Sequence, residues 1–274
     1  MPESIGGRVK TNRRSRSSDG VQQNKEKVME NTTIVNNTQT AQLRNVISLL
    51  TGVERAENRP PHLPGLVCFY GPSGWGKSYA AAYVANTKNA YYVELKSTWT
   101  VKYLLQAICK EMGLTYSTGD TLAVLGEMVT EQLILSGRAL IIDEFDYLVD
   151  KNKVDVIRDL FEGSAAPVIL IGEEQLPNKL KRWERTHGRI LDFIPAQPAS
   201  FEDAQALRDL YCKRVKIGDD LLEEIWKVAR GSVRRICVNL ERVQQTAITM
   251  AKREIGLNDW SEPFFTGDAP SRRV

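Results

Sequence analysis

The amino-acid sequence predicts an α/β fold in which a parallel sheet covered by helices is followed by a small all-α domain. Three observations predict this fold. Five short apolar runs show no alternation of apolar and polar residues, which is typical of strands buried on both faces. These runs alternate with segments of helical periodicity, as in a parallel sheet whose strands are joined by helices. From Ser200 onward every segment has helical periodicity, which indicates a second, helical domain.

The elements are expected in the following order. Residues 40–52 form a short amphipathic helix with Leu43, Val46, Ile47 and Leu50 on one face. The strands are expected at 66–70, 90–95, 139–142, 167–171 and 190–194. The helices of the sheet region are expected at 76–87, 101–112, 121–136, 152–162 and 177–185. The helices of the second domain, which we call the lid, are expected at 200–213, 219–229 and 232–254.

Composition shifts divide the chain into five parts. Residues 1–30 are expected to be a disordered basic tail, because so few apolar residues cannot offset the entropy lost on ordering. This tail is either an inert solubilising segment or a basic arm that touches DNA or a partner. Residues 31–64 hold the first helix and a proline-rich linker, residues 65–199 the α/β core, and residues 200–258 the lid. Residues 259–274 are a tail, either a partner-docking peptide or a frayed end.

The composition is that of a folded protein, with 42% apolar and 26% charged residues. No run approaches the roughly 18 apolar residues that span a membrane. The amino terminus lacks the apolar segment of a secretory signal, so we expect a cytoplasmic protein without membrane contact. The four cysteines lie far apart and are expected as reduced thiols, and the two histidines argue against a histidine metal site. The net charge of +3 permits nucleic-acid binding without indicating it.

The stretch GPSGWGKS, residues 71–78, follows an expected buried strand and opens an expected helix. It matches the phosphate-loop pattern G-x-x-x-x-G-K-S/T, in which glycines let backbone N–H groups point at phosphate oxygens. The helix N-terminus adds partial positive charge. Lys77 would reach the β- and γ-phosphates and the Ser78 hydroxyl would ligate Mg²⁺, so the sequence predicts binding of ATP with Mg²⁺. The residues expected to contact the nucleotide are Gly71, Ser73, Gly74, Trp75, Gly76, Lys77, Ser78 and Tyr79. For Trp75 the sequence suggests no chemical role.

Two acids stand at the end of the expected strand Leu140-Ile141-Ile142. In open α/β sheets, ligands bind at this carboxyl edge of the strands. Asp143 is expected to hold Mg²⁺ through water beside the nucleotide, and Glu144 to orient or deprotonate the attacking water. The presence of Glu144 favours hydrolysis over phosphoryl transfer to another substrate. Asp146 is expected to be a solvated or capping residue.

These features together resemble an AAA+ ATPase over residues 40–255, and within that group the phage Mu B transposition protein and its TniB/TnsC relatives. The stretches that carry the resemblance are GPSGWGKS at 71–78, IIDEFDYL at 141–148, VILIGE at 168–173 and GRI at 188–190. The resemblance implies a P-loop parallel sheet with a helical lid. It also implies ATPase activity and a role in choosing targets for DNA transposition.

The resemblance further implies roles for several arginines. The stretch GSVR at 231–234 matches the G-x-x-R of the sensor-2 region, so Arg234 would reach the γ-phosphate of its own subunit. Arg182, Arg185 and Arg189 precede the last strand, where the family places an arginine finger for the neighbouring subunit. We favour Arg189, with Arg185 second. Each of these arginines is alternatively an exposed surface residue.

One position departs from the family pattern. Many AAA+ proteins carry Asn, Ser or Thr after the fourth strand, at the sensor-1 position, whereas here Glu173 follows Gly172. An acid beside a γ-phosphate repels it unless the acid is paired or turned toward water. We therefore expect slow hydrolysis, which suits a protein whose ATP-bound state acts as a timer.

Proteins of this type form rings or helical filaments around duplex DNA, so the resemblance implies self-association with basic residues facing the axis. Two loops carry suitable residues, one after the second strand and one after the acidic pair. The candidate DNA contacts are Lys96, Trp99, Thr100, Lys102, Lys151 and Lys153, although each lysine is equally readable as a solvated surface residue. Because phosphate contacts carry no base information, we expect little sequence preference.

The primary hypothesis is an ATPase that oligomerises on duplex DNA when bound to ATP, delivers target DNA to a transposase, and hydrolyses ATP to disassemble. Two other hypotheses stay open. One is a helicase loader of the DnaC or IstB kind, and the other is a signalling ATPase without a DNA role.

Overall fold

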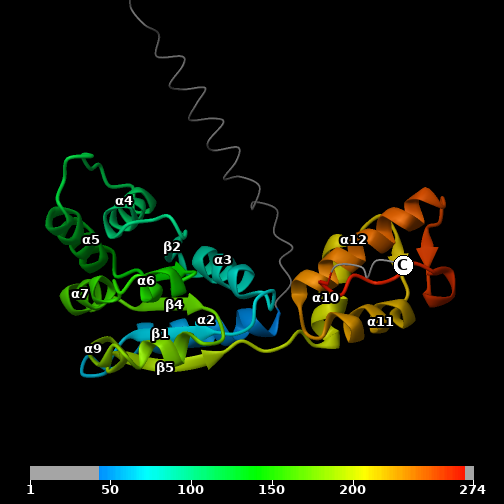
Figure 1. Cartoon of the computed structure of the whole chain (residues 1–274), viewed down its shortest axis with the longest axis horizontal. Helices are drawn as coiled ribbons and strands as arrows, with labels where there is room; N and C mark the ends of the chain where they lie inside the picture. The colour runs from blue at the N-terminus through cyan, green and yellow to red at the C-terminus, as the bar shows by residue number, and fades with distance from the viewer. Residues whose placement is uncertain (1–42, 269–274) are drawn as a thin grey trace, which may run out of the picture. The chain divides into compact units, whose positions relative to one another are not determined.

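The computed structural model describes residues 43–268, so the expected tail at 1–30 lies outside the described residues. Its centre is a five-stranded parallel sheet with the strand order β2-β3-β4-β1-β5 (Figure 1). The strands are β1 (Leu66–Tyr70), β2 (Tyr91–Glu94), β3 (Leu140–Asp143), β4 (Val168–Gly172) and β5 (Ile190–Pro195). All five expected strands are present, and the predicted α/β fold class is confirmed.

Helices cover both faces of this sheet, because successive residues of a strand point to opposite faces. The first core contains Val67 and Phe69 of β1 together with α2 and α3, whereas the second contains Leu66 and Cys68 with the helices that follow β2, β3 and β4. The helices of the first face are α2 (Arg44–Glu57) and α3 (Lys77–Lys88). The helices of the second face are α4 (Val101–Glu111), α5 (Leu122–Ser136), α6 (Asp146–Asp150), α7 (Asp155–Ser164) and α8 (Leu176–Leu180).

The expectation of strands buried on both faces is correct for the three central strands. It is wrong for β2 and β5, whose side chains are partly exposed. These two strands form the edges of the sheet, where the covering helices reach less completely.

Helix α2 extends further than expected, past residue 52 to Glu57. Most of the expected face is confirmed, since Leu43 and Val46 are buried and Leu50 packs against the first core, whereas Ile47 is 54% exposed. Leu49, Val53 and Ala56 complete the buried face. Gly52 allows this packing, because a Cβ atom there would overlap the Ile194 side chain of β5.

One helix was not expected, and one expected helix is interrupted. The expected helix at 152–162 is present as α7, and the short helix α6 precedes it directly after β3. The expected helix at 177–185 is split into α8 and α9 (Glu184–His187). Trp183 lies between the two with a non-helical backbone (φ −112°, ψ 65°) and packs against the second core. The break in the helix thus coincides with the partial burial of this large side chain.

The lid is formed by α10 (Phe201–Tyr211), α11 (Asp219–Ala229) and α12 (Val233–Thr249), which pack together in Figure 1. It also contains two short parallel strands, β6 (Lys216–Ile217) and β7 (Glu254–Ile255). The expectation of helix up to residue 254 was wrong, because Ala251 adopts a left-handed backbone (φ 55°) and the chain then pairs with β6. A 3₁₀ turn, η2 (Leu257–Asp259), follows.

The tail after η2 packs on the lid up to the last described residue, Asp268. Asn239 of α12 donates to the Phe265 carbonyl (3.0 Å) and accepts from the Phe265 N–H (2.7 Å). Trp260 and Phe264 stack with a centroid distance of 5.8 Å against the first core. Residues 259–268 are therefore packed rather than frayed, and the alternative of a partner-docking peptide stays a prediction.

The four cysteines are free thiols, and Cys68 and Cys109 are buried as expected. Burial raises the pKa of both thiols. Within residues 43–268, no helix has the length and apolar character needed to cross a bilayer.

Candidate functional site

The loop between β1 and α3 curls through two glycines with left-handed backbones, Gly74 (φ 82°) and Gly76 (φ 84°). As a result, the backbone N–H groups from Gly74 to Ser78 donate to no acceptor within residues 43–268. These N–H groups lie at the N-terminus of the 12-residue helix α3. Unpaired N–H groups at a helix N-terminus form an anion-binding site, so the loop suits a phosphate group.

The Lys77 side chain lies along the same loop. Its Nζ donates to the carbonyls of Gly71 (2.7 Å) and Pro72 (3.1 Å). Burial lowers the pKa of Lys77, although the nearby carboxylates of Glu144 and Asp143 act in the opposite direction. An ammonium held by two carbonyls can exchange them for phosphate oxygens, which are stronger charge-assisted acceptors.

Asp143 and Glu144 lie at the carboxyl end of β3. Asp143 is 1% exposed, and its Oδ1 accepts from the backbone N–H of Glu144 at 2.8 Å. Glu144 is half-buried and has a left-handed backbone (φ 57°), which is strained for a residue with a side chain. Burial and the neighbouring Asp143 raise the pKa of Glu144. A raised pKa makes a carboxylate a better proton acceptor, as a general base requires.

The residues present fit ATP with Mg²⁺. The unpaired N–H groups and Lys77 suit the phosphates. The exposed Ser78 hydroxyl and the Asp143 carboxylate are the kind of oxygen donors that Mg²⁺ takes from proteins. Trp75, for which the sequence suggested no role, packs partly against the first core, as does Tyr79. Ser73 is exposed in the loop.

Tyr92 is a site residue that sequence reasoning missed. It lies on β2, which pairs with β3, and its hydroxyl donates to Oδ2 of Asp143 at 3.1 Å. Burial and the Asp143 charge raise the pKa of Tyr92, so the hydroxyl keeps its proton and remains a donor. With Glu144 N–H on the other oxygen, Tyr92 fixes the orientation of the Asp143 carboxylate.

Tyr92→Phe is expected to weaken the affinity for Mg²⁺ specifically. Without the hydroxyl, Asp143 loses one of its two neutral hydrogen bonds and its orientation. We expect the Mg²⁺ concentration for half-maximal ATP hydrolysis to rise about fivefold, the effect of one such bond. Nucleotide binding without Mg²⁺, measured by titration in EDTA, should not change.

The control is Tyr91→Phe, which removes the neighbouring hydroxyl that accepts from Gln132 (3.1 Å) away from the acids. Equal effects of both variants on Mg²⁺ dependence would show that Tyr92 has no special role.

Asp146 was expected to be a solvated or capping residue, but the structure gives it a different role. It is 6% exposed, its Oδ2 accepts from the backbone N–H of Glu173 (2.6 Å), and its Oδ1 pairs with Lys179 (3.0 Å). The sequence separation of these partners explains why the local pattern did not reveal them. Asp146 thus fixes the backbone at the sensor-1 position, and the Glu173 side chain there is exposed. Glu173 therefore occupies the sensor-1 position, but its side chain is turned toward solvent.

Gly172→Ala is expected to destabilise the protein. A Cβ at Gly172 would overlap the Asp146 carboxylate and lie 2.6 Å from Leu176 Cδ2. Overpacking of this kind costs about 1–3 kcal/mol. Thermal unfolding should show a lower Tm by several degrees, roughly 2–4 °C per kcal/mol for a chain of this size.

The matched control is Gly126→Ala in α5, where a Cβ meets nothing within 4 Å. Alanine is favoured over glycine in a helix by about 1 kcal/mol, so this variant should be as stable as the parent or more stable. A Gly172→Ala protein with unchanged Tm would contradict the packing argument.

The lid reaches the phosphate loop through the start of α12. The backbone N–H of Arg234 donates to the Gly74 carbonyl at 3.1 Å, and Ser232 Oγ donates to the same oxygen at 3.4 Å. Gly74 also permits this approach, because a Cβ there would lie 2.8 Å from Ser232 Oγ. The Arg234 side chain is exposed next to the loop, and its contact with the γ-phosphate stays a prediction.

A family model described as an AAA domain matches residues 61–180. Solved structures match a larger part of the chain. Cdc6p from Pyrobaculum aerophilum is 14% identical with a TM-score of 0.58, and the match covers 82% of this chain and 68% of that one. Orc1 from Aeropyrum pernix in complex with DNA is 15% identical with a TM-score of 0.59, covering 81% and 65%. The RuvB Holliday junction branch migration motor of Thermotoga maritima is 20% identical with a TM-score of 0.54, covering 78% and 66%.

This chain has the AAA+ fold. It spans about two thirds of the length of these solved chains. A comparison with curated proteins found no match.

The AAA+ core places the candidate arginine fingers away from its own phosphate loop. The Arg189 carbonyl accepts from Leu66 N–H at the start of β1 (3.0 Å), whereas the phosphate loop follows the end of that strand. The Arg189 side chain is 48% exposed and pairs with Glu162 at 2.8 Å. Arg185 on α9 and Arg182 before it are exposed and make no ion pair with any described residue. The fold therefore brings none of the three to the site of its own subunit.

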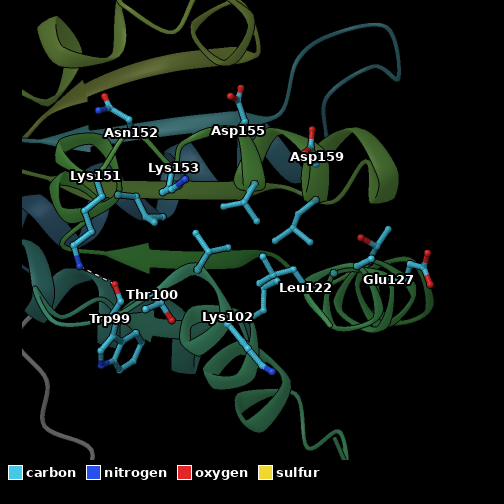
Figure 2. Close-up of a pocket in the computed structure, with 18 of the residues that line it drawn as sticks. Trp99, Thr100, Lys102, Leu122, Glu127, Lys151, Asn152, Lys153, Asp155 and Asp159 are labelled. Atoms are coloured by element: carbon cyan, nitrogen blue, oxygen red, sulfur yellow. Dashed lines mark hydrogen bonds between the residues drawn. The ribbon is translucent and has the colours of Figure 1, made fainter. Parts of the chain in front are cut away.

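The two loops with candidate DNA contacts lie side by side in the AAA+ core (Figure 2). Lys151 donates to the carbonyls of Ser97 and Trp99, the latter at 2.7 Å. Lys102 donates to the Thr118 carbonyl (2.9 Å), and Thr100 caps α4 by accepting from the Tyr103 N–H. Lys96 and Lys153 are exposed. Several candidate DNA contacts thus already have structural roles.

These loops border a groove of about 1260 Å³ between α4, α5 and α7. Figure 2 shows acidic side chains beside it as well as lysines, with Glu127 on α5 and Asp155 and Asp159 on α7. Acids repel DNA phosphates, so the groove itself does not suit a nucleic-acid contact. The lysines of the two loops suit such a contact better.

Proposed function

We propose that this chain is an AAA+ ATPase that binds ATP with Mg²⁺, oligomerises on duplex DNA, delivers target DNA to a transposase and hydrolyses ATP to disassemble. The observation that carries the ATPase part is the meeting of three features at one edge of the sheet. These are the unpaired N–H groups of the loop, the Lys77 amine, and the Asp143 and Glu144 carboxylates.

Each group of residues has a separate role in hydrolysis. The loop N–H groups and Lys77 bind the phosphates and offset their charge. Ser78 and Asp143 hold Mg²⁺, which when bound neutralises charge on the phosphates. Glu144 orients the water and takes its proton as the oxygen attacks the γ-phosphorus. The bond between that phosphorus and the β–γ bridging oxygen then breaks, which releases ADP and phosphate.

Self-association is supported by the positions of the arginines. Because Arg189 and Arg185 are exposed and remote from their own phosphate loop, either can complete the site of a neighbouring copy. Arg189 is our first choice, and release from Glu162 would free it. Such an arginine is worth about 10³–10⁵ in rate.

A mixing experiment tests this arrangement. Lys77→Ala lacks a nucleotide site and Arg189→Ala lacks the finger, so each alone should be inactive. Mixed in equal amounts, they should regain part of the ATPase rate, because the intact site of one variant meets the intact arginine of the other. If the mixture stays inactive, the same test with Arg185→Ala decides between the two arginines. If neither mixture regains activity, the proposal that an arginine completes the site of a neighbouring copy is contradicted.

DNA binding is supported by the exposed Lys96 and Lys153 on neighbouring loops, and by the similarity to the Aeropyrum pernix Orc1 solved in complex with DNA. Each phosphate contact should steepen the fall of log affinity with log salt by about 0.9, so one contact per subunit contributes about 0.9 times the number of subunits bound. Electrophoretic shift of random-sequence duplexes at two salt concentrations, with and without ATP, measures that slope. Binding that is independent of both ATP and salt would contradict the proposal.

The transposition role rests on the resemblance of four sequence stretches to the Mu B and TniB/TnsC proteins. Electron microscopy with duplex DNA and a slowly hydrolysed ATP analogue tests the assembly. A pull-down against a transposase and a replicative helicase tests the partner. Capture of the helicase alone would favour the helicase-loader hypothesis instead.

A further inference from the structure

Asn45, on the first turn of α2, is buried although it is polar (5% exposed). Its Nδ2 donates to the Trp75 carbonyl of the phosphate loop (2.8 Å) and to the Gln197 carbonyl (2.9 Å). Its Oδ1 accepts from the Gln197 N–H (2.7 Å). All three bonds join parts of the chain far apart in sequence, and the acceptor and donor partners leave one orientation of the amide possible.

Gln197 belongs to the segment 196–199 that connects β5 to the lid. This segment also touches the phosphate loop, because a Cβ at Gly71 would lie 2.8 Å from Ala196 Cβ. On its other side, the Ala199 N–H donates to the Gly231 carbonyl (3.0 Å), and Trp226 of the lid donates to the Ala199 carbonyl (2.8 Å). The segment therefore connects core and lid, and we call it the hinge. Asn45 joins this hinge to the phosphate loop.

The residue before Asn45 makes a second link to the lid. The start of α2 has no side-chain cap of its own, so its first N–H groups need acceptors. Arg44 N–H donates to Oδ1 of Asp203 on α10 (3.0 Å), while the other Asp203 oxygen completes the capping box of α10. The first turn of α2 thus contacts the phosphate loop, the hinge and the lid.

We infer that Asn45 is a positioning residue that holds the lid hinge and the phosphate loop in one arrangement, so that ATP meets a site already assembled. This inference rests on the proposed ATPase function. Without Asn45, the hinge and the loop separate in a large share of the nucleotide-free molecules. ATP then binds only the minority of molecules in which the hinge and the loop are assembled. Its apparent affinity therefore falls in proportion to the fraction of assembled molecules. Once ATP is bound and the parts are assembled, the chemical step is the same as in the parent.

The inference predicts a split between KM and kcat. Asn45→Ala removes all three hydrogen bonds, and Asn45→Asp keeps the acceptor for Gln197 N–H but removes both donated bonds. We expect the KM for ATP to rise about tenfold in both variants, with kcat changed less than twofold. If Asn45 only supported folding, the active fraction would fall, so kcat would drop while KM stayed the same.

Hydrogen exchange in the nucleotide-free protein provides an independent measurement. The Arg234 amide, which donates to Gly74, reports lid contact, and the Gln197 amide reports the hinge. We expect Arg234 to exchange about tenfold faster in both variants and Gln197 to exchange faster in Asn45→Ala. Amides of β3 and β4 should be unchanged, which also shows that each variant is folded.

The matched control is Asn58→Asp, at the other end of the same helix, where the exposed amide donates to Glu54 within α2 (2.9 Å). It should leave KM, kcat and exchange at Arg234 unchanged. Unchanged KM and Arg234 exchange in the Asn45 variants would overturn the inference. If the parent protein does not bind ATP, the proposed function fails, and the exchange experiment still decides the hinge role.

Discussion

Lys77→Ala is expected to lose ATP binding, and with it assembly on DNA. The amine is the one side-chain cation that the structure places within the phosphate loop, where it donates to Gly71 and Pro72. Hydrogen bonds from a charged group are worth about 1.5–3 kcal/mol each, so loss of contacts to the β- and γ-phosphates weakens binding by at least about 100-fold. If ATP joins neighbouring subunits, assembly on duplex DNA disappears as well.

Calorimetric titration with ATP and Mg²⁺ measures the first effect, and negative-stain microscopy with duplex DNA measures the second. The control is Lys88→Ala at the last residue of α3, whose amine pairs with Glu54 (2.8 Å) on the surface. This variant keeps the loop intact and should behave like the parent. Normal ATP binding by Lys77→Ala would contradict the assignment of the phosphate loop. Loss of ATP binding with normal assembly would support the phosphate loop but contradict the role of ATP at the subunit junction.

Glu144→Gln is expected to show the opposite pattern, with ATP retained and hydrolysis lost. The amide has the size of the carboxylate but cannot accept the proton of the attacking water. Loss of general-base catalysis lowers the rate by about 10²–10⁴-fold. The substitution also removes one negative charge near Lys77 and Asp143, so ATP affinity should be equal to or greater than that of the parent. Because disassembly depends on hydrolysis, the variant should stay assembled on DNA.

Single-turnover ATPase assays and microscopy after a chase with excess ADP test this expectation. The control is Glu174→Gln, an exposed acid just beyond the sensor-1 position, which should hydrolyse ATP at the parent rate. A Glu144→Gln protein that remains monomeric with ATP and DNA would refute the argument that ATP joins the subunits. Normal turnover would instead show that another residue is the base.

Much of the fold follows from local patterns. The five strands were found because runs such as Leu140–Ile142 are apolar without alternation, and the central ones are buried on both faces. The loop at 71–78 was found because its chemistry requires particular residues at fixed spacing. Local patterns did not predict where a helix ends when contacts with distant parts of the chain set that end. α2 continues past Gly52 because the glycine fits against Ile194, and the last long helix ends at Thr249 because the following residues pair with β6.

By itself, the sequence determined the α/β class, the phosphate loop and the acidic pair, since all three depend on residues within one strand or one turn. Only the tertiary structure decided what surrounds them. Tyr92 reaches Asp143 because β2 lies beside β3, Asp146 holds the Glu173 backbone, and Asn45 joins the loop to the hinge. These contacts span 27 to 152 residues of sequence. The order of the strands and the docking of α2 bring such partners together, and neither leaves a periodic signal in the chain.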